Sequence, residues 1–209
     1  MSAEIEFKLR IARADIVRLH HQADVRALRL ARPRSRRLIS FYYDTPALAL
    51  IHHGISLRVR YMSTRWYQSL KTAGSSQAGL HQRQEWEDRL EHGRPDLGKA
   101  LAHDSGHQAT LRNHAADLQP LFLTDVMRSE WQLQTPDAEI ELALDVGWLR
   151  SMRGDRVRIS EIELELKSGA VSELSRLARR LQSALPNLQP EDKSKAELGY
   201  ALALQHAPA

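Results

Sequence analysis

The sequence predicts an α+β protein in which a closed, antiparallel, eight-stranded β-barrel is flanked by helices. Eight segments have the character of β-strands, and four of them alternate charged and apolar residues with a strict period of two. Some strands carry acids on their charged face and others carry bases, so a closed barrel would set the two kinds of charge opposite each other. Segments with a helical spacing of apolar residues lie between and after the strands.

The strand-like segments begin near the N-terminus and recur along most of the chain. The four with strict alternation are residues 4–10, 56–60, 139–145 and 161–167. The four shorter candidates are residues 37–43, 66–71, 84–90 and 124–133. A loop of Gly and Ser over residues 74–79 separates two of these strands.

Helices are predicted in the intervals that the strands leave. The candidates are residues 15–23, 24–31, 97–102, 109–117, 172–185 and 194–205. The clearest of them has Leu174, Leu177 and Leu181 on one face and is stopped by Pro186. We see no linker that would divide the chain, so we expect a single domain over residues 1–209.

The charged faces of the strands point to function. Because residues i, i+2 and i+4 share one face of a strand, Glu4, Glu6 and Lys8 face one way and the apolar residues between them face the other. The same spacing groups two further acidic sets, Glu161 with Glu163 and Glu165, and Glu139 with Glu141 and Asp145. Basic side chains occur elsewhere along the chain, at Arg58, Arg60, Lys71, Lys193 and Lys195.

Two arrangements fit these charged faces. In an open antiparallel sheet the charged side meets water, which is the common arrangement for a single strand. Three adjacent carboxylates repel one another, however, and a solvated face usually mixes both signs of charge. A closed barrel with its charged faces inward would contain water, ions or a charged ligand, because unpaired buried charges are very costly. Carboxylates beside Arg and Lys are typical of a site for a metal-bound polyanion, since acids hold hard cations and bases hold phosphate oxygens.

The composition of the chain limits its function classes. The 209 residues include no cysteine, which excludes disulfides, thiolate metal sites and a Cys nucleophile. The net charge of +4 favours anionic partners without choosing among them. The N-terminal residues lack the apolar core of a signal peptide, and no stretch reaches the ~18 apolar residues of a membrane span. We therefore expect a cytoplasmic protein with no membrane partner.

A basic run before the second strand has two interpretations. It consists of Arg32, Arg34, Arg36 and Arg37. These residues could contact nucleic acid, but basic residues beside Pro33 are more typical of a solvated turn that leads into a strand. No stretch combines aromatic and basic residues as an RNA-stacking platform does. We therefore expect no nucleic-acid partner.

Short motifs follow one another in order along nearly the whole chain. They are Glu4-x-Glu6-x-Lys8, YYDTP at 42–46, LRVR at 57–60, Lys71 followed by GLHQR at 79–83, Asp125 with Arg128 and Trp131, the strands at 139–147 and 161–165, and SKA at 194–196 followed by GY at 199–200. In these motifs and in their order, the sequence resembles the CYTH superfamily, the triphosphate tunnel metalloenzymes. The resemblance is closest to the CYTH domain of bacterial inorganic triphosphatases.

The resemblance implies a role for each set of charges. The family's metal ligands fall on Glu4, Glu6, Glu163 and Glu165, with Glu161 beside them. Its phosphate-binding bases fall on Lys8, Arg58, Arg60, Lys71, Arg128 and Lys195. Further acids of the tunnel would be Glu85, Glu139, Glu141 and Asp145. The residues expected to be catalytic are Glu4, Glu6, Lys8 and Lys71. Without metal, Glu4 and Glu6 are expected to repel each other.

The resemblance also implies an activity. This is the hydrolysis of inorganic tripolyphosphate to pyrophosphate and orthophosphate inside the barrel, with Mg²⁺ or Mn²⁺ as cofactor. The alternatives are a class IV-type adenylate cyclase, a thiamine triphosphatase, or a non-catalytic polyphosphate-binding module. The match around Lys71 and Arg83 favours the inorganic enzyme, and intact carboxylates at both ends of the chain disfavour a mere binder. Relatives of this kind often carry a following histidine-rich helical domain, the CHAD domain, and we expect this chain to lack it because it ends at Ala209.

Overall fold

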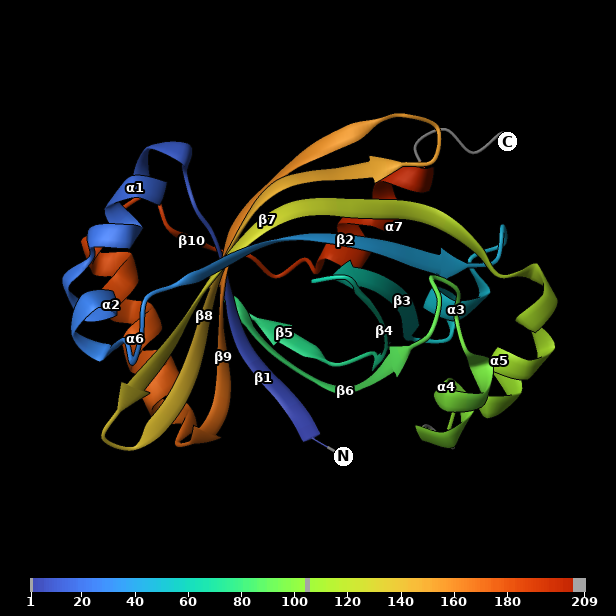
Figure 1. Ribbon diagram of the computed structural model, residues 1–209, viewed down its shortest axis with the longest axis horizontal. Coiled ribbons are helices and arrows are strands. Elements are labelled where there is room, and N and C mark those ends of the chain that lie inside the picture. Colours follow the sequence, from blue (N-terminus) through green and yellow to red (C-terminus); the bar gives the residue numbers. More distant parts are fainter. Residues whose placement is uncertain (1, 104–105, 205–209) are drawn as a thin grey trace.

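The computed structural model describes residues 2–103 and 106–204 of the protein, and strands dominate these ranges (Figure 1). In chain order the strands are β1 (Ser2–Arg10), β2 (Arg34–Asp44), β3 (Ile55–Met62), β4 (Arg65–Thr72), β5 (Ser75–Gln77), β6 (Leu80–Leu90), β7 (Gln119–Thr135), β8 (Ala138–Ser151), β9 (Arg156–Gly169) and β10 (Gln189–Pro190). Each of the eight segments predicted as strands lies within one of the eight longer elements. The short strands β5 and β10 were not predicted, and β5 lies in the stretch expected to be a loop.

The eight longer strands close into an antiparallel barrel. Their order among the described residues is β1-β9-β8-β7-β2-β3-β4-β6, and β6 pairs back with β1. The two short strands extend this sheet, β10 beside β1 and β5 beside β6. The expected α+β fold, a closed eight-stranded barrel with flanking helices, is therefore confirmed.

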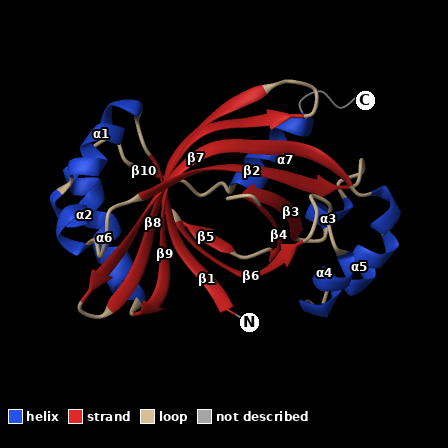
Figure 2. Ribbon diagram, viewed as in Figure 1, coloured by secondary structure: helices blue, strands red, loops and turns tan. Residues whose placement is uncertain are grey.

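Most of the helices lie at the two ends of the molecule (Figure 2). They are α1 (Arg13–His21), α2 (Ala23–Leu28), α3 (Ala49–His52), α4 (Leu97–His103), α5 (Gln108–Asn113), α6 (Val171–Ala184) and α7 (Lys195–Leu204), with a 3₁₀ helix at Ala115–Asp117. The helix predicted over residues 109–117 is split, because the helical pattern breaks at His114. The four-residue α3 was too short to predict, and residue 205 of the last predicted helix lies outside the described residues.

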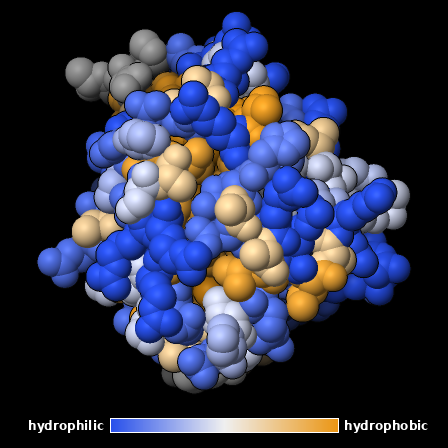
Figure 3. Space-filling model, turned by 90° about the vertical axis from the view of Figure 1, so that its left-hand side faces the viewer, coloured by the Kyte–Doolittle hydropathy of each residue, from blue (hydrophilic) through white to orange (hydrophobic). Residues whose placement is uncertain are grey.

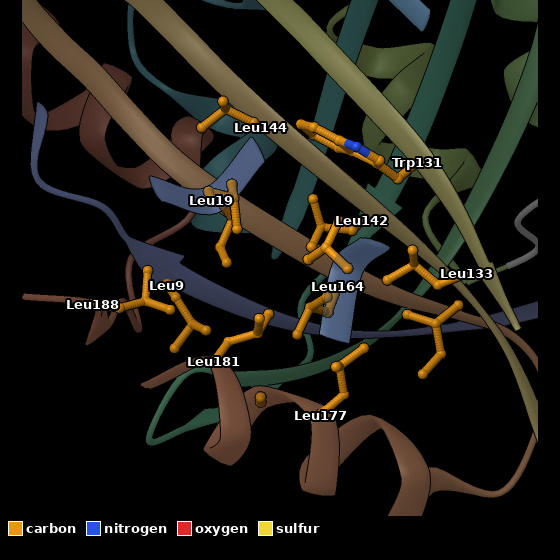
Figure 4. Close-up of a cluster of buried hydrophobic side chains, with 14 of the residues drawn as sticks. Leu9, Leu19, Trp131, Leu133, Leu142, Leu144, Leu164, Leu177, Leu181 and Leu188 are labelled. Atoms are coloured by element: carbon orange, nitrogen blue, oxygen red, sulfur yellow. The ribbon is translucent and has the colours of Figure 1, made fainter. Parts of the chain in front are cut away.

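The outer face of one half of the barrel packs against α1, α2 and α6 (Figure 4). The apolar residues that alternate with the charges of β1, β8 and β9 form this core, together with Leu177 and Leu181 of α6. Leu9, Leu142 and Leu164 are fully buried there. Full burial of one such side chain contributes about 1.5–3 kcal/mol. Because this core lies outside the sheet, the opposite, charged strand faces must point into the barrel.

A second outer core lies at the other end of the molecule. Leu50 of α3, Ala100 of α4 and Leu111 of α5 pack there against Leu57 and Leu70 of β3 and β4. Asp44 supports this end, because its buried carboxylate accepts hydrogen bonds from the backbone N–H groups of three residues, Thr45, Leu50 and Ile51. The short helix α3 therefore depends on the last residue of β2.

Helix α7 packs against β7 and β8 in a third apolar cluster. Tyr200 and Leu202 of α7 meet Tyr42, Phe122 and Leu149 there. Tyr42 lines the cavity of the barrel, so this cluster lies on the inner face of the sheet. The helix thus fills part of the barrel and brings its first residue, Lys195, to the charged interior.

The end of the molecule formed by α1, α2 and α6 presents a mainly hydrophilic surface with scattered apolar patches (Figure 3). Val17 and Leu30 are each 67% exposed, but isolated apolar residues at a surface are ordinary. None of the described helices combines the length and the apolar character that crossing a bilayer requires.

Candidate functional site in the barrel interior

A cavity of about 760 Å³ lies inside the barrel. Eight residues whose spacing predicts an inward direction all line it, namely Glu4, Glu6, Arg58, Arg60, Lys71, Glu85, Glu163 and Glu165. Lys8, Arg128, Glu141 and Lys195 line it as well. The fold therefore brings acids and bases from both halves of the chain into one cavity.

The first group of charges centres on Arg83 of β6. Its Nε donates to Glu4 Oε2 at 2.7 Å, and its Nη2 donates to Glu6 Oε1 at 2.7 Å. Lys71 Nζ lies 3.1 Å from Glu4 Oε2 and 2.9 Å from Glu85 Oε2. One guanidinium thus bridges the first two acids of the chain, and Lys71 links them to Glu85.

Glu4 and Glu6 differ in the direction of their pKa shift. Burial raises the pKa of Glu4, but the Lys71 and Arg83 cations outweigh burial and hold its pKa well below the usual range. Burial and the charge of Glu163 raise the pKa of Glu6, and its cationic neighbours do not offset them. The expected repulsion between these acids is present, since the charge of Glu4 adds to the raised pKa of Glu6, but at Glu4 the two cations that contact its carboxylate outweigh it.

The second group of charges centres on Lys195 of α7. Its Nζ lies 2.8 Å from Asp145 Oδ2 and 2.6 Å from Glu163 Oε1, and it also pairs with Glu161. Arg128 donates to Asp145 at 2.7 and 2.8 Å and contacts Glu163. Oxygen atoms of the three acids lie within 4.8 Å of one another, a spacing that could hold a metal ion. In this structure the ammonium of Lys195 already holds all three acids together.

Three residues in the expected set lie elsewhere than predicted. Asp145, expected to line the tunnel, is buried against Arg128 and Lys195 and does not line the cavity. Glu161, expected beside the metal ligands, does not line the cavity and is buried against Lys8 and Lys195. Glu139, expected to line the tunnel, is exposed and also lies outside the cavity. Glu139 pairs with Ser168 of β9. The pairing of β9 with β1 ends at Glu165, so Glu139 lies beyond the closed part of the barrel.

Arg60 differs from the other bases that line the cavity. Its Nε donates to Ser40 Oγ at 2.9 Å, and no carboxylate of the described residues lies within 4.0 Å of it. Burial, with the charges of Arg58 and Arg128, lowers the pKa of Arg60 to about 10. A half-buried guanidinium without a counter-ion favours an anionic ligand, because the ligand would supply the missing charge.

The donor set also suits a hard divalent cation. Glu6 lies opposite Glu165 in the β1–β9 pair. Burial is the main cause that raises the pKa of each of these carboxyls, and nearby carboxylates add to the shift. Each of these acids has one cationic contact, Arg83 for Glu6 and Lys167 for Glu165, and the carboxylates offer the oxygen donors that Mg²⁺ and Mn²⁺ prefer.

Six charged residues that line the cavity were absent from the predicted set of site residues, namely Arg36, Arg83, Glu87, Glu130, Lys167 and Glu197. Arg83 shares its strand face with Glu85, so the period of two could have assigned it to the interior. Arg36 was interpreted as part of a solvated turn, but it lies in β2 and lines the cavity. Its Nη2 donates to Glu130 Oε2 at 2.6 Å, and Glu130 lines the cavity too.

Comparisons with known proteins agree with this geometry. The chain is 32% identical over 168 residues to an inorganic triphosphatase of Haemophilus influenzae. That match covers 77% of the chain and 44% of the relative, so the chain spans less than half of the relative's length.

Two solved structures share the fold. A candidate adenylyl cyclase from Hippeastrum, described as having a dominant triphosphatase activity, has a TM-score of 0.64, 17% identity and 95% coverage of both chains. A candidate adenylate cyclase from Bacillus halodurans has a TM-score of 0.59, 18% identity, and coverage of 95% of this chain and 98% of that one. The CYTH domain model matches residues 2–200, and the chain therefore belongs to the CYTH domain family.

Proposed function

We propose that the protein hydrolyses inorganic tripolyphosphate to pyrophosphate and orthophosphate in the barrel cavity, with Mg²⁺ or Mn²⁺ as cofactor. The observation that carries this proposal is Arg60, a half-buried cation without a carboxylate partner among the described residues, in the same cavity as the facing acids Glu6 and Glu165. A site with an unpaired cation at one place and facing carboxylates at another suits a polyanion that arrives with a divalent cation. The likeness to an inorganic triphosphatase supports the same reading.

The cation would be held by Glu4, Glu6 and Glu165, with Glu163 beside them. Bound there, it would neutralise phosphate oxygens and polarise the terminal phosphorus. Glu161 has a different role in this proposal, because its pairs with Lys8 and Lys195 make it a support for those two cations. Lys195 and Arg128 would then line the other end of the cavity. Asp145 pairs with both of them and holds them in position there.

The chain's own residues would perform the remaining steps. Arg58 and Arg60 bind phosphate oxygens and fix the polyphosphate along the cavity. Lys71 donates hydrogen bonds to the phosphoryl group that is transferred, and so stabilises the charge that develops on it. Glu85, 2.9 Å from Lys71, accepts a hydrogen bond from the attacking water and orients it. No covalent intermediate with the protein is required.

Phosphate release from four compounds tests the proposal. Tripolyphosphate, ATP, pyrophosphate and thiamine triphosphate are each incubated with the protein and Mg²⁺ or Mn²⁺. Tripolyphosphate should turn over fastest, because a site built from charge selects by phosphate number and metal. Pyrophosphate should turn over poorly, because it is too short to contact both the metal ligands and the two arginines that bind phosphate, Arg58 and Arg60.

Other results would assign a different activity. Formation of cyclic AMP and pyrophosphate from ATP, faster than phosphate release from tripolyphosphate, would make the protein an adenylate cyclase. Preferred hydrolysis of thiamine triphosphate would make it a thiamine triphosphatase. Tight binding of tripolyphosphate without phosphate release under either metal would make it a polyphosphate-binding module.

A further inference from the structure

Arg36 and Arg37 are neighbours in sequence but lie on opposite faces of β2. Arg36 shares the inner face with Leu38 and Ser40, and it lines the cavity. Arg37 does not line the cavity, and both of its bonds to Asp125 are 2.8 Å long. The exposed fraction of the side chain is 33% for Arg36 and 61% for Arg37. The two residues therefore form a natural comparison of an inner and an outer arginine.

The guanidinium of Arg36 is only partly satisfied. Its Nη2 donates to Glu130 Oε2 at 2.6 Å. Its Nε is buried and has no hydrogen-bond partner among the described residues. Buried polar atoms in folded proteins are nearly always hydrogen-bonded, so an unmatched donor at a cavity wall suggests a ligand. An anionic oxygen would satisfy it best, because charge-assisted hydrogen bonds are the strongest that arginine makes.

The surroundings of Arg36 show which ligand could reach it. Arg128 lies opposite Arg36 in the β2–β7 register, but Asp145 and Glu163 already occupy its guanidinium. Arg60 has no acid partner in the described part of the chain, and its hydrogen bond to Ser40 connects it to the same strand face, four residues along β2 from Arg36. Four residues of an extended strand cover about 13 Å. A linear anion that contacts both arginines must run along β2 from Ser40 towards Arg36.

We propose that Arg36 and Glu130 form a subsite for the phosphates of a linear polyphosphate beyond the first three. This inference rests on the proposed function, because it extends the same cavity and the same class of substrate. Arg36 supplies the donors for the additional phosphate. Glu130 neutralises Arg36 while the subsite is empty, and it competes with the phosphate for the guanidinium. The pair thereby sets how strongly the protein prefers four or more phosphates over three.

Two polyphosphates and four proteins test this subsite. Tripolyphosphate and tetrapolyphosphate are compared as substrates with Mg²⁺, and as ligands by calorimetry in metal-free buffer of low ionic strength. The proteins are the wild type, Arg36→Met, Glu130→Gln and the matched control Arg37→Met. Because a hydrogen bond to a charged group is worth about 1.5–3 kcal/mol, Arg36→Met should weaken tetrapolyphosphate about tenfold or more, in both kcat/KM and affinity.

The response of tripolyphosphate decides the interpretation. In Arg36→Met, the kcat/KM and the affinity for tripolyphosphate should stay within about threefold of the wild-type values. A threefold change is smaller than the effect of losing one hydrogen bond to a charged group. Glu130→Gln should strengthen tetrapolyphosphate binding alone, because it removes the competing carboxylate. Arg37→Met should change neither compound. Equal losses on both polyphosphates, or no loss on either, would overturn the subsite.

Further arms keep the test decisive. If Arg36→Met does not fold, as judged by circular dichroism and urea unfolding, the opposite effect of Glu130→Gln carries the comparison. If the wild-type protein hydrolyses neither compound, the proposed function fails, but the difference in metal-free affinity still tests the subsite. Unchanged relative affinity in Glu130→Gln would then overturn it.

Discussion

Neighbouring charges on one strand face can have opposite effects on stability. Glu4 and Glu6 are two residues apart in β1, and both line the cavity. Lys71 and Arg83 contact the first, whereas the second has one guanidinium contact and faces other carboxylates. The environment of each carboxylate, more than its residue type, therefore decides whether its ionisation favours the folded state.

The first prediction compares Glu4→Gln with Glu6→Gln in the metal-free protein. Glu4→Gln should lower the free energy of unfolding by about 1.5–3 kcal/mol, because Lys71 and Arg83, both partly buried, each lose one of their two carboxylate partners. Glu6→Gln should raise it, because the folded state raises the pKa of Glu6 above the ordinary value of 4.5 and so disfavours its charged form. Urea unfolding at neutral pH, with chelator present, measures both changes.

The pH dependence provides a check on the sign. A carboxyl whose pKa is raised on folding binds more protons in the native state, so its contribution to stability falls as pH rises from 4.5 through the folded pKa. The gain from Glu6→Gln should therefore vanish in acid and grow towards neutral pH. A gain that is the same at all pH values would rule out this explanation.

The second prediction concerns Arg60. Arg60→Met should stabilise the metal-free protein, because it removes a half-buried cation that has no acid partner among residues 2–103 and 106–204. It should also lower kcat/KM for tripolyphosphate about 10²–10³-fold, the scale for losing one donor that stabilises developing charge. Phosphate release and urea unfolding on the same preparation measure the two effects. Arg65→Met, at an exposed residue outside the cavity, is the control and should change neither.

Sequence reasoning succeeded for residues on strands with clear alternation and failed where the pattern was mixed. Glu4, Glu6, Glu163 and Glu165 alternate with apolar neighbours, so their common face could be assigned from the sequence. Arg36 and Arg37 are adjacent bases on opposite faces, and no periodicity distinguishes the inner one from the outer one. What separates them is their partner, Glu130 or Asp125, which lies about 90 residues away along the chain.

Single elements can also control the site, and α7 is the clearest case. Its first residue, Lys195, holds three acids of the interior, and its later residues pack against Phe122. Gly199 allows this approach, because a Cβ at that position would lie 2.0 Å from Phe122 Cε2. Phe122 is fully buried and stacks on Tyr42, so its ring has little room to move.

The third prediction is that Gly199→Ala destabilises the protein although it improves helix propensity. Alanine should favour the helix by about 1 kcal/mol over glycine. Overpacking against a confined ring should cost about 1–3 kcal/mol and shift α7, and with it Lys195. The temperature of thermal unfolding and the kcat/KM for tripolyphosphate should both decrease. Ala201→Gly changes an exposed residue of the same helix and is the control. It should lower stability only by the difference in helix propensity between alanine and glycine, and it should preserve activity.

The position of α7 could not be predicted from its own sequence. The segment was identified as a helix, but its apolar residues form no single stripe that would indicate which surface it covers. Only the closed barrel offers an apolar inner surface at Tyr42, Phe122 and Leu149. The short elements α3, β5 and β10 escaped prediction for a related reason, since they exist through contacts with longer neighbours.

At the scale of the whole molecule, acids and bases of the interior are largely paired with one another. Arg83, Lys71, Arg128 and Lys195 each contact at least two carboxylates. A divalent cation alone must compete with these bases for carboxylates, and a polyphosphate alone must compete with carboxylates for the bases. Binding both together adds charges of opposite sign, so each ligand should compensate for the disturbance caused by the other.

The fourth prediction is that metal and polyphosphate bind cooperatively. The affinity for Mn²⁺ should rise about tenfold or more in the presence of a triphosphate whose bridging oxygens are replaced by imido groups. The affinity for that analogue should rise by the same factor when Mn²⁺ is present, because coupling between sites is reciprocal. Isothermal titration in both orders measures the two factors. If the two ligands bound independently, the acids and bases of the interior would not compete with the ligands as proposed.

Closure of the barrel has a consequence for how the protein folds. β1 pairs with both β6 and β9, so the two edges of the sheet meet at the N-terminal strand. During synthesis β1 emerges first, but one of its partners, Arg156–Gly169, is made about 150 residues later. Contacts so distant in sequence slow folding, because a long loop must close before they can form. The seam at β1 should therefore form late, and amide protons of β1 should gain protection from exchange only as β9 docks.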